Sequence, residues 1–144
     1  MERIKLPVAV HLFLISNNKI LLSRRFNTGF QDGNYSVVAG HIEGNETILQ
    51  AMKREAAEEA NLHFEDEQLK IVQVMHRKSA TEERIDYFLY ADSWEGEIKN
   101  NEPGKCDDLR WFPVGDFPEN MVPYVRYAIE AYFNGELFTE FGWR

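Results

Sequence analysis

Cysteine is almost absent from the 144-residue sequence, and so are long hydrophobic runs. Cys106 is the single cysteine, which excludes a disulfide within the chain and is typical of a reducing compartment. No apolar run approaches the roughly 20 residues that a membrane-spanning helix needs. Glu2, Arg3 and Lys5 also interrupt the beginning of the chain, where a signal peptide would be apolar. We therefore expect a cytoplasmic protein with no membrane partner.

Positive charge is also scarce. The chain has 16 Lys and Arg residues against 24 Asp and Glu residues, a formal net charge of −8. An acidic chain does not attract nucleic acid polymers or anionic lipid by its overall field. If the ligand is a phosphate compound, a local feature must reverse that field, and a bound divalent cation is the usual device. We expect a small-molecule partner and no nucleic acid polymer.

Apolar and aromatic residues, in contrast, are sufficient for one folded core. Hydrophobic residues make up 44% of the chain and aromatic residues 13%, so we expect a single domain over residues 1–144. Apolar and β-branched runs predict strands, and an apolar stripe at helical spacing predicts an early helix over 46–60, capped by Asn45 and ended by Asn61. Pro123 fits the first turn of a late helix. The strands expected are 6–16, 19–24, 35–39, 69–76, 84–93 and 109–114. The order favours an α/β fold with a helix-flanked mixed sheet.

Three carboxylates share one face of the early helix. Glu55, Glu58 and Glu59 stand at positions i, i+3 and i+4, where they repel one another unless a cation lies between them. Mg²⁺ prefers such hard oxygen ligands, and the backbone carbonyl of Gly40 can approach without side-chain obstruction. Arg54 can hold Glu58 and the incoming loop in place. The alternative is an ordinary solvated acidic face, because glutamate is a strong helix former.

A wider pattern separates these alternatives. Six residues between positions 40 and 59 match the signature G-x5-E-x7-R-E-U-x-E-E-x-G-U, so the chain resembles the Nudix hydrolases, and its small domain resembles their MutT-like members. Two positions depart from the signature: Ala56 replaces a larger aliphatic residue, and Asn61 replaces the second glycine. Asparagine is the residue that best tolerates the left-handed conformation after glycine. Neither change replaces an expected metal ligand. The matching residues are Gly40, Glu46, Arg54, Glu55, Glu58 and Glu59.

The resemblance implies a mechanism and a fold. It implies an α/β/α sandwich with a central mixed sheet, and Mg²⁺-dependent hydrolysis of a diphosphate bond by a metal-activated water, with Mn²⁺ as a possible substitute. The Gly40 carbonyl, Glu55, Glu58 and Glu59 would hold the metal. Many Nudix enzymes use a further acidic residue beyond the signature, and residues 102–108 offer Glu102, Asp107 and Asp108. We favour Glu102 as a ligand or proton acceptor, the alternative being a flexible acidic surface loop. The catalytic candidates are Glu58, Glu55, Arg54 and Glu102.

Four residues near the signature are candidates for binding the substrate. Arg24 and Arg25 end a strand beside a glycine-bearing loop and can clamp phosphates, although strand alternation predicts that at most one faces the site. His41 can donate to a phosphate. Glu43 can join the outer shell of the metal, or it is simply a loop carboxylate.

Other residues have weaker signals. Phe30, Tyr35 and Tyr124 are candidates for stacking on a base, although core packing is the better expectation for each. We assign no role to Cys106. The remaining histidines, His11, His63 and His76, show no metal-ligand spacing and are expected to be structural.

Three functions are compatible with these residues. The first is a nucleoside-triphosphate pyrophosphohydrolase. The second is a hydrolase of a nucleoside diphosphate linked to another moiety, such as ADP-ribose or a dinucleoside polyphosphate. Many ADP-ribose enzymes of this family carry a proline some fifteen residues after the signature, and here no proline occurs between Pro7 and Pro103. The third is a non-catalytic nucleotide-binding module, although such modules have usually lost the carboxylates. The long strands and the aromatic residues also permit a homodimer.

Overall fold

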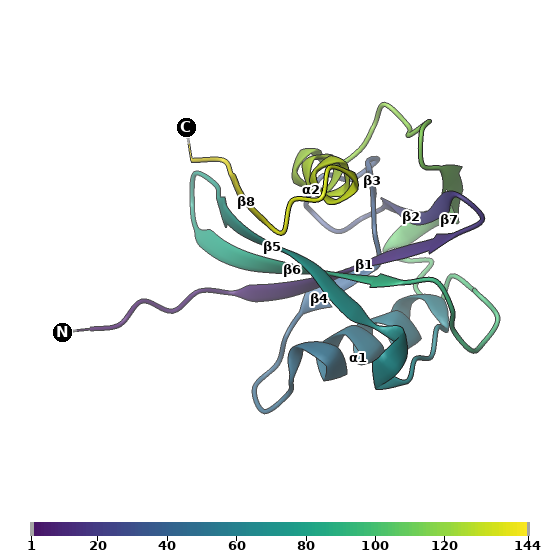
Figure 1. The fold of residues 1–144 in the computed structure, drawn as a ribbon. Coiled ribbons are helices and arrows are strands. Elements are labelled where there is room, and N and C mark those ends of the chain that lie inside the picture. The colour runs from purple at the N-terminus through teal and green to yellow at the C-terminus, as the bar shows by residue number, and fades with distance from the viewer. Residues whose placement is uncertain (1, 144) are drawn as a thin grey trace.

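A mixed sheet lies between two helices in the computed structural model, which describes residues 2–143 (Figure 1). Helix α1 (Ile48–Ala60) covers one face of the sheet and helix α2 (Pro123–Phe133) covers the other. A short 3-10 helix, η1 (Asp66–Gln68), precedes the fifth strand. The strands are β1 (Val8–Ser16), β2 (Lys19–Arg25), β3 (Tyr35–Ser36), β4 (Ala39–His41), β5 (Lys70–Lys78), β6 (Glu83–Ala91), β7 (Cys106–Pro113) and β8 (Phe138–Phe141).

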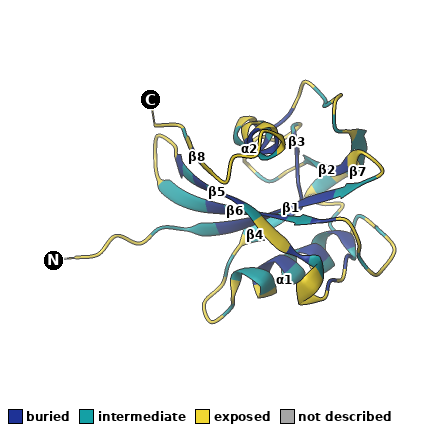
Figure 2. Ribbon diagram, in the orientation of Figure 1, coloured by how far each residue is buried: buried dark blue, intermediate teal, exposed yellow. Residues whose placement is uncertain are grey.

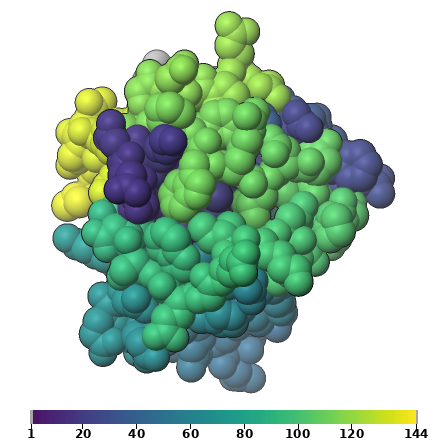
Figure 3. Space-filling model, turned by 90° about the vertical axis from the view of Figure 1, so that its right-hand side faces the viewer, coloured from purple at the N-terminus to yellow at the C-terminus, as the bar shows by residue number. Residues whose placement is uncertain are grey.

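Strand β1 is the hub of the sheet. The main path runs β3-β2-β1-β6-β5-β8, while β4 pairs with β1 and β7 pairs with β2. The β1–β6 and β5–β8 pairs are parallel, and the other pairs are antiparallel. The turn between β1 and β2 lies against the segment that follows β7, where the backbone N–H of Val114 donates to the carbonyl of Asn18. In Figure 3 the purple atoms of this turn lie between green atoms of later segments and the yellow atoms of the C-terminal part.

Strand β1 is buried on both faces, as its unbroken apolar run predicts. Val10, Leu12 and Leu14 pack on the side of α1, whereas Phe13 packs on the side of α2. Figure 2 shows the corresponding dark core along the middle of the sheet, between the two helices. The chain therefore forms two apolar layers, one on each face of a shared sheet.

Helix α1 begins two residues later than the sequence predicts. Thr47, not Asn45, is the N-cap: its side chain accepts the N–H of Gln50, and the Gln50 side chain accepts the N–H of Thr47. Glu46 stays outside the helix because its carboxylate accepts the N–H of Glu43 and pairs with Arg54. Asn61 ends the helix in the left-handed conformation, with φ 59°, as predicted.

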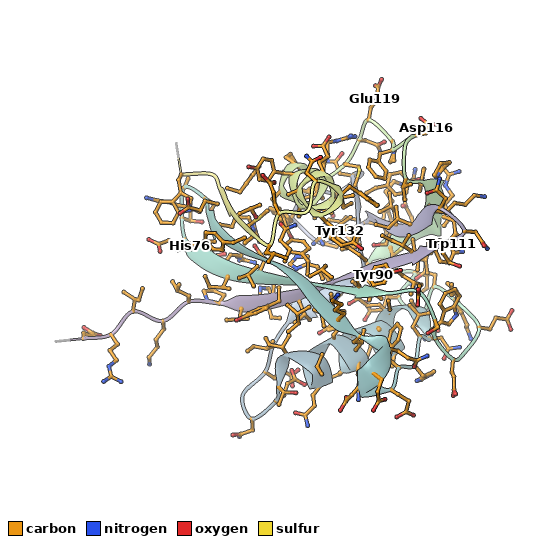
Figure 4. The ribbon with its side chains drawn as sticks, in the orientation of Figure 1. His76, Tyr90, Trp111, Asp116, Glu119 and Tyr132 are labelled. Atoms are coloured by element: carbon orange, nitrogen blue, oxygen red, sulfur yellow. The ribbon has the colours of Figure 1, made fainter. Side chains whose placement is uncertain are left out.

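Helix α2 begins at Pro123, as predicted, and presents an apolar face to the sheet. Val125, Ala128 and Ile129 are fully buried on that face. Figure 4 shows Tyr132 of α2 above Tyr90 of β6, and the two rings stack with centroids 6.0 Å apart. This packing holds α2 on the sheet face opposite α1.

Three strand predictions differ from the structure. The expected strand 35–39 is two short strands, β3 and β4, which pair with different partners. Strand β7 begins at Cys106 rather than at residue 109, because Cys106 and Asp108 already pair with β2. Strand β8 was not expected: it has only four residues, and Phe138 within it is exposed. Within residues 2–143, no helix is long and apolar enough to cross a membrane.

Candidate active site

A cavity of about 920 Å³ opens where β1, β2, β4 and α1 meet. Six basic and six acidic side chains line it, so a strongly polar site interrupts the apolar layers. The structure brings together at this cavity all ten residues that the sequence singled out as catalytic, metal-binding or substrate-binding. They are Arg24, Arg25, Gly40, His41, Glu43, Arg54, Glu55, Glu58, Glu59 and Glu102. Their individual roles stay predictions.

Arg54 fixes the loop before α1 to the helix. Its Nε and Nη2 donate to the two carboxylate oxygens of Glu46 at 3.0 and 2.8 Å, and Nη2 also donates to the carbonyl of His41 at 3.1 Å. The pKa of Glu46 is lowered to about 2, chiefly by the hydrogen bond from Arg54 and then by the N–H of Glu43. Nη1 donates to Glu55 at 2.7 Å, whereas Glu58 lies farther away, at 3.6 Å. Arg54 therefore orients Glu55 and the end of β4 more directly than it orients Glu58.

Gly40 makes the close approach of β4 and α1 possible. A Cβ atom built on Gly40 would overlap the carboxyl group of Glu55, so any side chain here would displace that carboxylate. Because β4 pairs with β1 through Gly40 and Val10, the position of this backbone is set by the sheet. The glycine of the signature is thus required by the contact between a strand and a helical carboxylate.

Glu59 is the most buried carboxylate of the site. Burial raises its pKa well above the ordinary value, and a hydrogen bond with Glu55 and the negative charge of Glu55 raise it further. The Ala39 N–H, at 3.4 Å from Glu59, acts in the opposite direction. Two carboxyl groups held together in a half-buried site share a proton or bind a cation. Their oxygens are the hard ligands that Mg²⁺ and Mn²⁺ accept, so this donor set fits a divalent ion.

Glu58 does not join the other two carboxylates in this arrangement. Its side chain is 54% exposed and directed toward Arg54. Accordingly, within residues 2–143 no three His, Cys, Asp or Glu side chains are gathered closely enough to hold a metal as they stand. The expected ligand set therefore requires the Glu58 side chain to rotate away from Arg54. Such a change of rotamer costs an exposed glutamate little.

The loop that carries Glu102 is tied to the end of α1. The N–H of Asn101 donates to the carbonyl of Glu59 at 3.0 Å, and the Asn101 side chain donates to the carbonyl of Ala57. Within the loop, the N–H of Glu102 donates to the Asn100 side chain, and its carbonyl accepts the N–H groups of Lys105 and Cys106. These hydrogen bonds tie the loop to α1, and the role of Glu102 stays a prediction. Glu102 is held at the cavity, and its charge helps to raise the pKa of Glu59.

The other two acidic candidates point elsewhere. Asp107 accepts from Nε of Arg24 at 2.7 Å, and Asp108 binds the hydroxyl of Tyr35 and Nε of Arg110. Neither residue lines the cavity. Of the three carboxylates in residues 102–108, Glu102 alone lines the cavity.

Arg24 and Arg25 both line the cavity, which corrects the expectation that at most one would. The pairing of β2 with β7 shifts register between these two residues, and such an irregularity breaks the alternation of a regular strand. Arg24 is held by Asp107. Arg25 donates to the carbonyl of Phe30 at 2.6 Å and to the Thr28 hydroxyl at 3.0 Å.

The aromatic candidates divide between the core and the cavity. Tyr35 is buried in the layer beneath α2, as core packing predicts. Phe30 is 46% exposed at the cavity, with the guanidinium of Arg25 5.2 Å from its ring centroid. Tyr124 also lines the cavity, and its hydroxyl lies 3.0 Å from Nε2 of His11. His11 is therefore a buried cavity residue, whereas His63 and His76 do not line the cavity.

Sequence reasoning missed three basic residues at the cavity: Arg77, Arg84 and Lys105. Arg77 and Arg84 lie on β5 and β6, far along the chain from the signature. Their approach depends on the register of the two strands, which no local pattern discloses. Cys106 also lines the cavity, where burial raises the pKa of its thiol. A raised thiol pKa disfavours the nucleophilic thiolate, which supports assigning it no chemical role.

Known proteins resemble this chain in sequence and in fold. A family model of the NUDIX domain matches residues 5–132. The 8-oxo-dGTP diphosphatase of Escherichia coli (strain K12) is 28% identical over 126 residues, which are 84% of this chain and 94% of that protein. The crystal structure of a MutT NUDIX hydrolase from Burkholderia pseudomallei superposes with a TM-score of 0.81 at 23% identity, covering 88% of this chain and 97% of the other. This likeness confirms the predicted α/β fold with its central mixed sheet.

A second similar structure contains ligands. It is a bifunctional NMN adenylyltransferase/ADP ribose pyrophosphatase from Francisella tularensis, complexed with AMP and a Mn ion. It superposes with a TM-score of 0.72 at 22% identity, over 90% of this chain and 42% of that one.

Proposed function

Because the chain belongs to the Nudix family and is a hydrolase of that family, we propose that it cleaves a diphosphate bond of a nucleoside triphosphate in a Mg²⁺-dependent reaction. One observation carries the proposal: the backbone of Gly40 abuts the carboxylate of Glu55, and Glu55 pairs with the half-buried Glu59. Two carboxyl groups placed so close together, beside a cavity with further charged groups, form a site for a cation and an anionic substrate.

Four groups would hold the metal: the Gly40 carbonyl and the carboxylates of Glu55, Glu58 and Glu59. A divalent ion bound there lowers the pKa of a water and neutralises charge on phosphoryl oxygens, and Mn²⁺ can replace Mg²⁺ in this chemistry. Arg54 is a positioning residue, since its guanidinium holds Glu55, Glu46 and the carbonyl of His41 in one arrangement.

The protein's own groups can then move the proton and hold the substrate. Glu58 and Glu102 line the cavity, and either carboxylate would accept a proton from the attacking water. Arg24, Arg25, His41 and Glu43 line the same cavity. The first three would donate hydrogen bonds to phosphoryl oxygens.

The triphosphate is the first candidate substrate because the Escherichia coli relative, whose name specifies 8-oxo-dGTP, is similar over 94% of its length. The second candidate is ADP-ribose, which the name of the Francisella tularensis neighbour specifies. The missing proline after the signature argues for the triphosphate. A purified-protein assay with Mg²⁺ or Mn²⁺ on oxidised and ordinary nucleoside triphosphates, nucleoside diphosphates, ADP-ribose and dinucleoside polyphosphates separates the candidates. We expect the highest kcat/KM on a triphosphate, with pyrophosphate or phosphate released.

Carboxylate variants test the same proposal at the site. We expect Glu58→Gln and Glu59→Gln each to lower kcat/KM by at least about 10²-fold, because the bound metal and its activated water supply several kcal/mol of transition-state stabilisation. Glu67→Gln is the matched control, since Glu67 is exposed on η1 and does not line the cavity. Full activity in both site variants, or no release of phosphate from any nucleotide by the wild type, would refute the proposal.

A further inference from the structure

Two arginines face each other across neighbouring strands at one end of the cavity. Arg77 of β5 and Arg84 of β6 are register partners, so their side chains leave the same face of the sheet, and both line the cavity. Like charges directly opposite each other destabilise an antiparallel pair. Such a placement is costly for folding alone and is favourable when an anion accepts hydrogen bonds from both residues.

Arg77 is held rigidly. Its Nε and Nη2 donate to the fully buried carboxylate of Asp86 at 2.7 and 3.3 Å, and its guanidinium carbon lies 3.6 Å from the ring centroid of Tyr124. The side chain is 10% exposed, and among the described residues Nη1 has no hydrogen-bond partner. Arg77 therefore presents one preorganised donor edge to the cavity at no further ordering cost.

Arg84 is held by contacts that a ligand can replace. Its Nη2 donates to Glu82, a carboxylate 40% exposed in the turn between β5 and β6, and its Nη1 lies 3.2 Å from Nε2 of His41. An exposed ion pair of this kind contributes little to stability. A phosphoryl oxygen can displace Glu82 from Arg84 without disturbing the sheet.

This end of the cavity adjoins the carboxylates. His41, which contacts Arg84, directly follows Gly40 on β4, and its carbonyl is bound by Arg54. The hydroxyl-bearing residues Ser79 and Thr81 line the same end. His41 thus contacts both groups: its carbonyl is bound by Arg54, and its imidazole lies 3.2 Å from Nη1 of Arg84. The carboxylates and the two arginines line one and the same cavity.

We infer that Arg77 and Arg84 form a second anion subsite, which binds a phosphoryl group of the substrate other than the two joined by the cleaved bond. The inference rests on the proposed function, and for a nucleoside triphosphate the group is the third phosphoryl. The subsite selects triphosphates over diphosphates.

Binding measurements without divalent cations test the subsite separately from catalysis. Calorimetry gives Kd for the mono-, di- and triphosphate of adenosine with the full chain and with Arg84→Gln. We expect Arg84→Gln to raise Kd for the triphosphate about 10-fold, since hydrogen bonds between charged groups are among the strong ones, and to change Kd for the other two less than about 2-fold. Arg110→Gln is the control, because Arg110 is also a strand arginine paired with a carboxylate but does not line the cavity.

A second variant tests the subsite without changing either arginine, so that a misfolded Arg84→Gln protein cannot decide the outcome. Glu82→Gln removes the competitor for Arg84 from an exposed turn, and we expect it to lower Kd for the triphosphate. Equal effects of Arg84→Gln on all three nucleotides would assign Arg84 to a part that they share, the base, the sugar or the first phosphoryl group, and would overturn the subsite, as would no effect at all. Turnover with Mg²⁺ is measured independently. If the wild type hydrolyses triphosphates but Arg84→Gln leaves Kd unchanged, only the subsite is refuted. Absent turnover with the expected Kd changes refutes only the proposed reaction.

Discussion

The contact between Gly40 and Glu55 constrains the site at the scale of single residues. We expect Gly40→Ala to lower kcat/KM by about 10²-fold, because the added methyl group displaces a carboxylate that the chemistry needs in place. Gly44→Ala is the control in the loop that follows β4, since a Cβ there meets no atom within 4 Å. Steady-state kinetics of both variants, with circular dichroism as a check on folding, makes the comparison. Equal activity in the two variants would show that the close approach is unimportant.

His11 makes the fold sensitive to acid. Burial lowers its pKa from 6.5 to about 4, and in the neutral ring Nδ1 faces the Tyr87 carbonyl while Nε2 faces the Tyr124 hydroxyl. Because the folded pKa lies below the unfolded value, the unfolded chain binds more protons between pH 6.5 and 4, and stability is lost as pH falls through this window. By pH 4.5 the loss attributable to His11 is about 2–3 kcal/mol.

Urea unfolding at pH 7 and pH 4.5 measures this loss. His11→Gln is expected to lose about 2–3 kcal/mol less than the wild type between the two pH values. The exposed His63 supplies the control variant His63→Gln, for which the wild-type loss is expected. An identical acid response in wild type and His11→Gln would contradict the assignment.

The signature residues could be predicted from the sequence because they are local. Spacing alone puts Glu55, Glu58 and Glu59 on one helix face. Glu46, just before α1, lies eight residues from its partner Arg54. Arg84 could not be predicted, because its place at the cavity depends on which residue of β5 it faces. Its neighbour on the primary chain, Glu83, does not line the cavity.

At the scale of elements, the N-terminus of α1 is expected to depend on one side chain. Thr47→Ala removes the hydroxyl that accepts the Gln50 N–H, and we expect a loss of about 1 kcal/mol. For a chain of this size the melting temperature should fall by roughly 3 °C. Thr47→Ser retains the hydroxyl and should retain most of the stability, so thermal unfolding of the two variants separates capping from packing. Equal melting temperatures for Thr47→Ala and wild type would exclude the cap.

Long elements were predictable and short ones were not. The apolar stripe through Met52, Ala56 and Ala60 predicted α1, and Pro123 predicted the beginning of α2. The N-cap was misplaced because Asn45 is also a capping residue type, yet its φ of 65° places it in the preceding turn. Strand β8 has too few residues for a periodic pattern, and its pairing with β5 becomes evident only in the folded sheet.

At the scale of the whole molecule, metal binding is expected to stabilise the fold. Because the crowded pair Glu55 and Glu59 is relieved by a cation, Mg²⁺ at about 100 times its Kd should add about 2.7 kcal/mol. The melting temperature should therefore rise by several degrees. Thermal unfolding with MgCl₂, and with NaCl at the same ionic strength, separates binding from screening of the −8 net charge. Glu59→Gln should lose most of the shift, and an equal rise with NaCl would contradict specific binding.

The order of the expected strands and helices predicted the fold class, but it did not predict the order of the strands in the sheet. The alternation of strands with two helices was enough to predict a mixed sheet covered on both faces, but nothing local indicates that β1 pairs with β6 rather than with β5. The homodimer that the sequence permits is not tested by the structure. The described surface does expose apolar side chains, among them Phe133, Leu137 and Phe138.

The parallel pairing of β1 with β6 has a kinetic consequence. It joins Val8 to Ile85, so more than half of the chain must exist before the central ladder can close. Hairpins such as β1–β2 and β5–β6 bridge short separations and can form early, whereas distant pairings are slow because loop closure costs entropy before any contact repays it. Arg84 reaches His41 only when β6 lies beside β1. We therefore expect the cavity to be completed late in folding, and a chain emerging from the ribosome to acquire it only after most of its length has been synthesised.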